Sequence, residues 1–184
     1  LMGSRENGVQ VFRGVPYAAA PTGENRWRAP QPVEPWAGVR AATAHEPPCA
    51  QPVDTDTTVA NFGGVNGAQS EDCLYLTITA PENAQGAPVL VWFHGGAFFL
   101  GAGSLGSYDG TANAQQGVIT VSVNYRLGAL GWMAHPELSA ESPHGVSGNY
   151  GLLDQIAALR WVRENVAAFG GDPDRVLVYG QSGG

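Results

Sequence analysis

Apolar residues along this chain gather in short continuous runs, at residues 89–93, 118–125 and 175–180. A strand that is covered on both faces needs apolar side chains on both, so each run predicts a strand buried between layers of helices. A further segment, residues 74–79, alternates apolar side chains with Tyr and Thr. That alternation also predicts a strand.

The segment between the last two runs has the spacing of a helix. Apolar residues recur there three or four positions apart, at Leu152, Ile156, Leu159, Val162 and Val166. Gly170 and Gly171 can adopt the left-handed conformation that ends a helix, and Pro173 cannot continue one. A strand, a helix and a strand in succession form the unit of a parallel sheet. We therefore predict an α/β fold with a central, mostly parallel sheet and flanking helices.

The N-terminal part of the chain, up to the alternating segment, lacks such a pattern. It is dense in Pro and Gly, with Trp and Tyr interspersed. We expect an irregular segment that follows the surface. Because no internal repeat or low-complexity linker divides the chain, we expect residues 1–184 to be part of a single domain.

Composition and charge narrow the choice of partners. Apolar residues make up 43% of the 184 residues, which is typical of a packed globular chain. Sixteen acidic residues against nine basic ones give a net charge of −7, which disfavours nucleic acid or an anionic membrane as a partner. No apolar run approaches the ~20 residues of a membrane helix, and the first residues do not form a signal segment.

The strongest candidate for chemistry is the stretch G-Q-S-G-G at residues 180–184. It fits G-x-S-x-G and directly follows a predicted buried strand, which is the context of a nucleophile elbow. In such an elbow the strand turns sharply into a helix, so that the hydroxyl of the central serine, here Ser182, stands exposed. Short glycine patterns also occur by chance, and the alternative is a glycine-rich turn with an incidental serine.

A second glycine motif, residues 94–97, also follows a predicted strand. H-G-G-A resembles the loop that supplies backbone N–H donors to an oxyanion in α/β-hydrolases. An ordinary turn after a strand is the simpler explanation for this motif alone. Two such motifs in the right order on two strands of one sheet favour the catalytic interpretation. Phe98 and Phe99, which follow, are candidates for either a pocket wall or the core.

Other motifs do not carry a cofactor or metal. The stretch at 101–106 matches G-x-G-x-x-G, but it does not open a helix directly after a strand, and the next strand ends in Asn124 rather than an acidic residue. The histidines share no metal-ligand spacing: His45, His94, His135 and His144. Cys49 and Cys73 lack ligand spacing too, and they are either bridged or two separate buried thiols.

Together these motifs resemble the N-terminal portion of the type-B carboxylesterase family, which includes cholinesterases and bacterial para-nitrobenzyl esterases. Further segments that match in family order are FRGVPYAAAPTGENRWRAPQP, EDCLYLTI, VWFHGGAFFLG, VNYRLGALGW, GNYGLLDQIAALRWVRENVAAFGGDPDRV and YGQSGG. The resemblance covers nearly all of the chain. It implies an α/β-hydrolase fold and the hydrolysis of small-molecule carboxylic esters through an acyl-enzyme, without a cofactor.

The resemblance also assigns roles to residues. Ser182 would be the nucleophile, and the backbone N–H groups of Gly96, Ala97 and Gly183 would form the oxyanion hole, with Gly95 making the approach turn. The implied structural pairs are the Cys49–Cys73 disulfide and two ion pairs, Arg26–Glu71 and Arg126–Asp154. The disulfide favours an extracytoplasmic location.

The chain also departs from the family pattern. Gln181 stands where cholinesterases have Glu, and Gly183 replaces the more usual Ala. Family members are several hundred residues long, and their catalytic acid and histidine lie downstream of the nucleophile. We therefore expect that this stretch is truncated at both ends, that it is inactive by itself, and that it aggregates or folds only partly. The alternative from another class is a non-catalytic, cholinesterase-like adhesion domain, which the presence of Ser182 disfavours.

Overall fold

The computed structural model describes residues 1–53, 64–65 and 67–184. The strands are β1 Ser4–Glu6, β2 Val9–Pro16, β3 Tyr75–Pro81, β4 Ala87–Phe93, β5 Ile119–Val123 and β6 Gly171–Gly180. The helices are α2 Thr111–Gln115, α3 Gly128–Trp132, α4 Pro136–Glu141 and α5 Tyr150–Asn165, with 3-10 turns η1 Gly23–Asn25, η2 Gly106–Tyr108 and η3 Val166–Phe169. The strands predicted from the apolar runs and the predicted long helix are all present. The burial predicted for the run at 175–180 is wrong for the described structure, because β6 is an edge strand with Leu177 and Val178 exposed.

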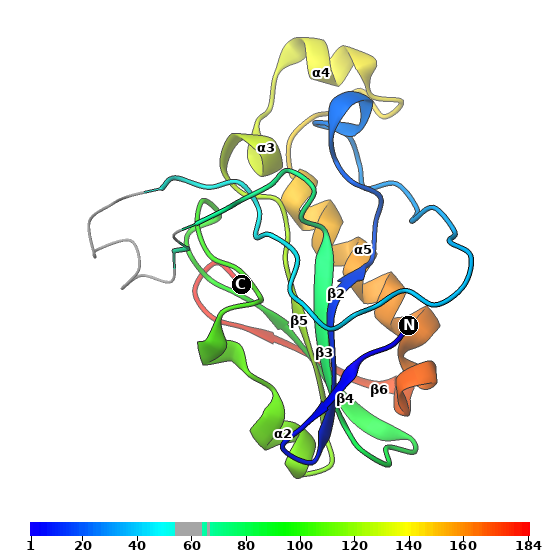
Figure 1. The fold of residues 1–184 in the computed structure, drawn as a ribbon. Helices are drawn as coiled ribbons and strands as arrows, with labels where there is room; N and C mark the ends of the chain where they lie inside the picture. Colours follow the sequence, from blue (N-terminus) through cyan, green and yellow to red (C-terminus); the bar gives the residue numbers. More distant parts are fainter. Residues whose placement is uncertain (54–63, 66) are drawn as a thin grey trace.

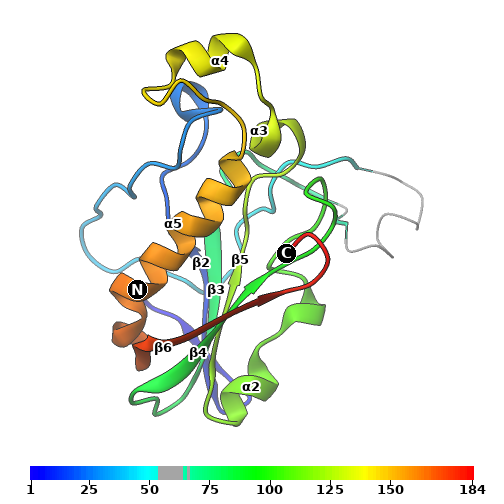
Figure 2. The same cartoon turned by 180° about the vertical axis from the view of Figure 1, so that it is seen from behind.

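One twisted sheet of six strands forms the centre of the molecule, in the order β1-β2-β3-β5-β4-β6 (Figure 1). The α/β fold is confirmed, and the sheet is mixed. The parallel pairing expected for most of the sheet holds for β5, β4 and β6, whereas β1, β2, β3 and β5 pair antiparallel. Helix α5 lies on one side of the sheet and α2 on the other, as the two opposite views show (Figures 1 and 2).

The N-terminal segment is more ordered than its composition indicates. Residues 4–16 form the hairpin of β1 and β2, and β2 pairs with β3. The turn of this hairpin is Asn7-Gly8, with φ of 50° and 77°, the backbone geometry that asparagine and glycine favour in tight hairpins. A register shift between Phe12 and Val15 interrupts the alternation of β2, which is why its apolar pattern is weak.

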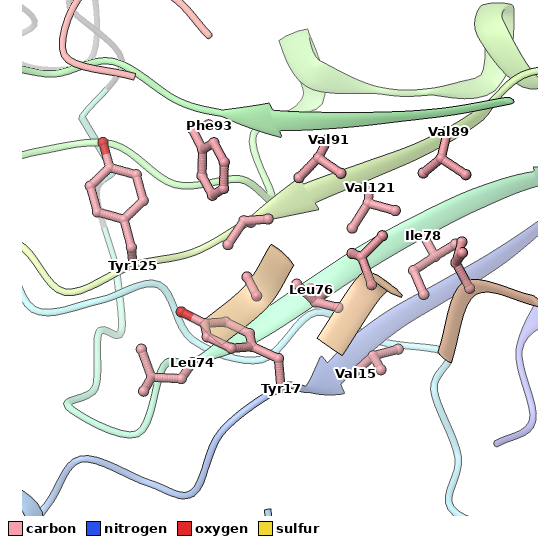
Figure 3. Packing of buried hydrophobic residues seen from close by; sticks show 14 of the residues in the cluster. Val15, Tyr17, Leu74, Leu76, Ile78, Val89, Val91, Phe93, Val121 and Tyr125 are labelled. Carbon is pink, nitrogen blue, oxygen red and sulfur yellow. The ribbon is translucent and has the colours of Figure 1, made fainter. Parts of the chain in front are cut away.

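The main core lies between the sheet and α5. Figure 3 shows side chains from β2, β3, β4 and β5 packed side by side on this face, among them Val15, Ile78, Val91 and Val121. Ala158 and Val162 of α5 are fully buried against them. Leu152 and Ile156, which share the same periodic apolar pattern, are 45% and 38% exposed. Leu159 and Trp161 also pack against this core, so the apolar pattern of α5 is divided between the buried face and the surface.

The helical segment ends at the glycine that the sequence predicts. Gly170 has φ of 83° and ends η3 in the left-handed conformation. Among the described residues, no helix is long and apolar enough to cross a membrane.

Candidate active site

The two glycine motifs meet at one edge of the sheet because their strands are parallel neighbours. Strands β4 and β6 pair in register up to Phe93 and Gly180, their last residues. Residues 94–97 follow the first and residues 181–184 the second, so the two turns leave the sheet side by side. Figure 2 shows the green loop after β4 next to the red turn at the C-terminus.

The turn at Ser182 has the strained backbone of a nucleophile elbow. Ser182 itself has φ of 56°, a left-handed conformation that is uncommon for serine. The N–H of Gly184 donates to the carbonyl of Gln181 at 2.9 Å and closes the turn. A side chain on Gly180 would collide with the backbone of Gly184, and one on Gly184 would collide with the carbonyl of Phe93. The glycines therefore allow the turn, and Ser182 is exposed on it.

The loop after β4 has three successive residues with positive φ. They are Gly96 at 111°, Ala97 at 51° and Phe98 at 65°. The N–H groups of Phe99 and Leu100 both donate to the carbonyl of Gly96, at 3.0 and 3.1 Å, and make the loop a compact turn.

This loop contacts the elbow directly. A methyl group on Gly95 would lie 2.6 Å from the carbonyl oxygen of Gln181 and 3.2 Å from Cβ of Ser182. A methyl group on Gly183 would lie 3.6 Å from Cα of Ala97. Within the described residues, no hydrogen bond is donated by the backbone N–H of Gly96, Ala97 or Gly183. Three unpaired donors thus lie in the segments that surround Ser182.

His94 supports the loop from inside the protein. Its side chain is 1% exposed and stacks on Tyr125, with 4.4 Å between ring centroids. Burial lowers the pKa of His94 to about 4, so the imidazole is neutral near pH 7 and its Nδ1–H donates to the carbonyl of Gly95 at 2.8 Å. The hydroxyl of Tyr125 donates to the carbonyl of His94 at 2.6 Å.

Polar side chains that the sequence did not single out hold the rest of the loop. The amide of Gln51 bonds both backbone groups of Gly101, each at 2.8 Å. Asn124 accepts from the N–H of Gly103 at 2.9 Å. Asn124 and Tyr125 lie at the end of a predicted buried strand, and that position could have indicated a role near the site. No feature of the sequence around Gln51 indicates its contact.

The two ion pairs differ in burial. Arg126 donates to Asp154 through Nη2, Nε and its backbone N–H at 2.7, 2.8 and 3.0 Å, and both side chains are nearly inaccessible. Burial raises the pKa of Asp154, and these hydrogen bonds oppose that rise. Arg26 and Glu71 form a bidentate pair at 2.6 and 2.8 Å that is partly exposed.

The Cys49–Cys73 disulfide is confirmed. It lines a small cavity together with Arg26, Glu71 and Arg126, and so connects the surroundings of both ion pairs.

The remaining candidates lie apart from the elbow. His45 is 3.1 Å from Oγ1 of Thr77, and His135 accepts from the N–H of Glu137 at the start of α4. No cluster of three or more potential metal ligands occurs among the residues that the structure describes. The G-x-G-x-x-G stretch leads into the short turn η2 and does not open a helix.

Known proteins match this chain in sequence and in fold. The model of the carboxylesterase family matches residues 1–184. The chain is 49% identical over 181 residues to fumonisin B1 esterase of Sphingopyxis macrogoltabida, covering 97% of this chain and 33% of that protein. It is 50% identical over 186 residues to para-nitrobenzyl esterase of Bacillus subtilis (strain 168), covering 100% and 37%.

A solved structure of PNB esterase superposes with a TM-score of 0.88 at 50% identity, over 99% of this chain and 36% of the other. The sheet and helices described above are those of the α/β-hydrolase fold that these esterases share. The chain spans about a third of the length of the relatives it matches. Because the family model matches residues 1–184, which is the whole of this chain, the chain belongs to the carboxylesterase family.

Proposed function

We propose that Ser182 is the nucleophile of a carboxylic ester hydrolase that works through an acyl-enzyme. The observation that carries the proposal is the contact between two turns. The strained, exposed Ser182 lies against a loop in which the backbone N–H groups of Gly96 and Ala97 have no partner among the described residues. The family membership supports the same conclusion.

In the proposed reaction, Oγ of Ser182 attacks the carbonyl carbon of the ester while its proton passes to a histidine base. The carbonyl oxygen becomes an oxyanion that accepts hydrogen bonds from the N–H groups of Gly96, Ala97 and Gly183. In other enzymes one such donor lowers the barrier by roughly 3 to 4 kcal/mol. The protonated histidine then gives its proton to the alkoxide oxygen as the C–O bond breaks, so that the neutral alcohol leaves and the acyl group stays on Oγ. Water attacks this ester with the same base and releases the acid.

We propose that the base and its orienting acid come from a part of the protein outside these 184 residues. None of the four histidines suits the role, because His94 is buried and neutral with its Nδ1 engaged at Gly95, and the others lie apart from the elbow. A serine without a base keeps a very high hydroxyl pKa and reacts slowly. The isolated 184-residue chain is therefore inactive in this proposal.

Turnover of p-nitrophenyl acetate by the full-length protein tests the assignment. Ser182→Ala should lower kcat by at least about 10⁴-fold, because removing a triad serine elsewhere costs that much or more. Ser107→Ala is the matched control, since Ser107 is an exposed serine on another loop. Turnover by Ser182→Ala at the wild-type rate would show that Ser182 is not the nucleophile, whereas absence of turnover in the wild type would support the non-catalytic adhesion-type alternative.

A further inference from the structure

The oxyanion donors and the nucleophile come from two separate turns, so the position of one turn against the other sets the distance between them. We propose that Phe98 is a positioning residue: its ring holds the loop after β4 against the elbow and so sets the position of the donors relative to Ser182. The inference rests on the proposed function and adds to it a residue that does not itself touch the reacting atoms.

The ring of Phe98 bridges the two turns. Phe98 directly follows Ala97 in the loop, and two atoms of its ring lie 3.4 and 3.5 Å from the position that a Cβ of Gly183 would take. Gly183 directly follows Ser182 and is one of the proposed donors. The ring therefore lies next to Gly183, the residue of the elbow that is proposed to donate to the oxyanion. Phe98 as a whole is 39% exposed.

The ring is supported from behind by a chain of packed groups. Its centroid lies 4.4 Å from that of Trp132 at the end of α3. Trp132 in turn packs on the first turn of α5, where a methyl group on Gly151 would come within 2.9 Å of the indole ring. Trp132 and the start of α5 therefore support the side of the Phe98 ring that packs on Trp132.

The backbone of Phe98 is fixed as well. Its carbonyl accepts a hydrogen bond from the N–H of Gly128 at 2.7 Å, which ties the loop to the start of α3. Its φ of 65° is a conformation that phenylalanine rarely adopts and that persists only where surrounding contacts enforce it. The strain and the fixed carbonyl together place the ring over the elbow.

Such a residue acts on the transition state more than on the ground state. When donors aimed at the developing oxyanion are displaced, kcat falls. A displacement of about 1 Å can lower the rate by about 10²-fold. The bound ester loses less stabilisation than the transition state does, because its carbonyl oxygen carries less charge. Phe98 should therefore affect kcat and the binding of oxyanion mimics and leave KM almost unchanged.

The test compares Phe98→Ala with wild type in the full-length protein, using p-nitrophenyl acetate and a trifluoromethyl ketone, which adds to the serine and forms an oxyanion. Active sites are titrated with an organophosphonate so that only competent enzyme is counted. We expect kcat to fall by about 10-fold to 10²-fold with KM changed less than about threefold. The inhibition constant of the ketone should rise by the same factor as kcat falls.

Trp36→Ala is the control for loss of a surface aromatic, since Trp36 is 43% exposed and packs on Arg40. If Phe98→Ala does not fold, Phe98→Leu keeps part of the packing and should show a smaller loss of the same kind. Unchanged kcat and ketone binding per titrated site, or an effect on KM alone, would overturn the inference. Absence of Ser182-dependent turnover in the wild type would instead overturn the proposed function on which it rests.

Discussion

At the scale of single residues, the site depends on glycines. At these positions two backbone segments lie so close together that a side chain would not fit between them. Gly95 faces Gln181 and Ser182, and Gly184 faces the carbonyl of Phe93. Neither of these two glycines has a positive φ, so the requirement is for space and not for a special conformation. In the sequence they look like ordinary turn glycines, and only the packing of β4 beside β6 reveals their role.

Gly95→Ala should separate the loop from the elbow. The new methyl group would lie 2.5 Å from Oε1 and 2.6 Å from the carbonyl oxygen of Gln181, and the carbonyl cannot rotate away. We expect kcat of the full-length protein to fall by about 10²-fold, measured per titrated site. Gly106→Ala is the control, because nothing lies within 4 Å of its added methyl. Equal activity of the two variants would contradict the contact.

His94 makes the fold sensitive to mild acid. Burial lowers its pKa to about 4 from 6.5, so the unfolded chain binds the proton at a higher pH than the folded protein does. The stabilisation is complete above pH 6.5 and is lost as the pH falls from 6.5 to 4. Over that interval the free energy of unfolding should drop by about 3 kcal/mol on account of this residue.

Denaturant titrations at several pH values measure this effect. His94→Gln should be less stable at pH 7 but should lose less stability between pH 6.5 and 4, since glutamine does not titrate. His45, which is partly buried, also has a lowered pKa and contributes a slope of the same sign in both proteins. Parallel pH profiles for wild type and variant would show that His94 is not buried in its neutral form.

At the scale of elements, the sequence predicted the strands that have continuous apolar runs. It did not predict β2, which is defined by its pairing with a distant strand. Runs that are apolar on both faces identified β4, β5 and β6; in the described structure β5 is buried along its whole length, β4 is buried at alternate residues, and β6 is an exposed edge strand. The β2 strand escaped because a register shift breaks its alternation and its partner, β3, is distant in sequence. Of the apolar pattern that predicted α5, only Val162 lies among the fully buried residues of that helix, and the others are Tyr150, Gly151, Asp154 and Ala158.

That aspartate joins α5 to the end of β5 through Arg126. Asp154→Asn would leave the guanidinium without a counter-charge in a site where both side chains are almost fully buried. We expect the free energy of unfolding to fall by about 3–5 kcal/mol. Asp174→Asn is the matched control, because its pair with Arg163 is 3.8 Å long and exposed, and it should change stability by less than about 1 kcal/mol. Similar losses in both variants, by thermal or chemical denaturation, would count against the buried pair.

At the scale of the whole molecule, the described structure exposes apolar side chains on β6 and on α5. Strand β6 is the last in the sheet order, and its Leu177 and Val178 are 61% and 47% exposed. Leu152 and Ile156 of α5 are exposed as well. Exposed apolar patches and open strand edges favour association.

The isolated 184-residue chain should therefore self-associate as its concentration rises. Leu177→Lys should reduce the apparent mass in analytical ultracentrifugation, because a charge on the edge strand opposes pairing. Val39→Lys, at a residue that is 74% exposed in the N-terminal segment, should have no such effect. A monomeric wild-type chain at high concentration would show that this surface is not adhesive.

The candidate site was predictable in part. Ser182 and the glycine loop each follow a strand that its apolar run predicts, and their motifs are short enough to be read along the sequence. The contacts that give them a common geometry are not local: Gln51 reaches Gly101 across 50 positions, and Tyr125 reaches His94 across 31. Such supports depend on the strand order of the finished sheet and have no sequence pattern of their own.

The most direct measurement is the site and stoichiometry of covalent modification by an organophosphonate. In the full-length protein, we expect one phosphonyl group per chain, located on Ser182 by mass spectrometry of peptides, with ester hydrolysis lost in proportion to its incorporation. The isolated 184-residue chain, which lacks the proposed base, should remain unmodified under the same conditions. Complete loss of activity with the group on another residue, or full activity with Ser182 modified, would contradict the assignment of Ser182 as the nucleophile.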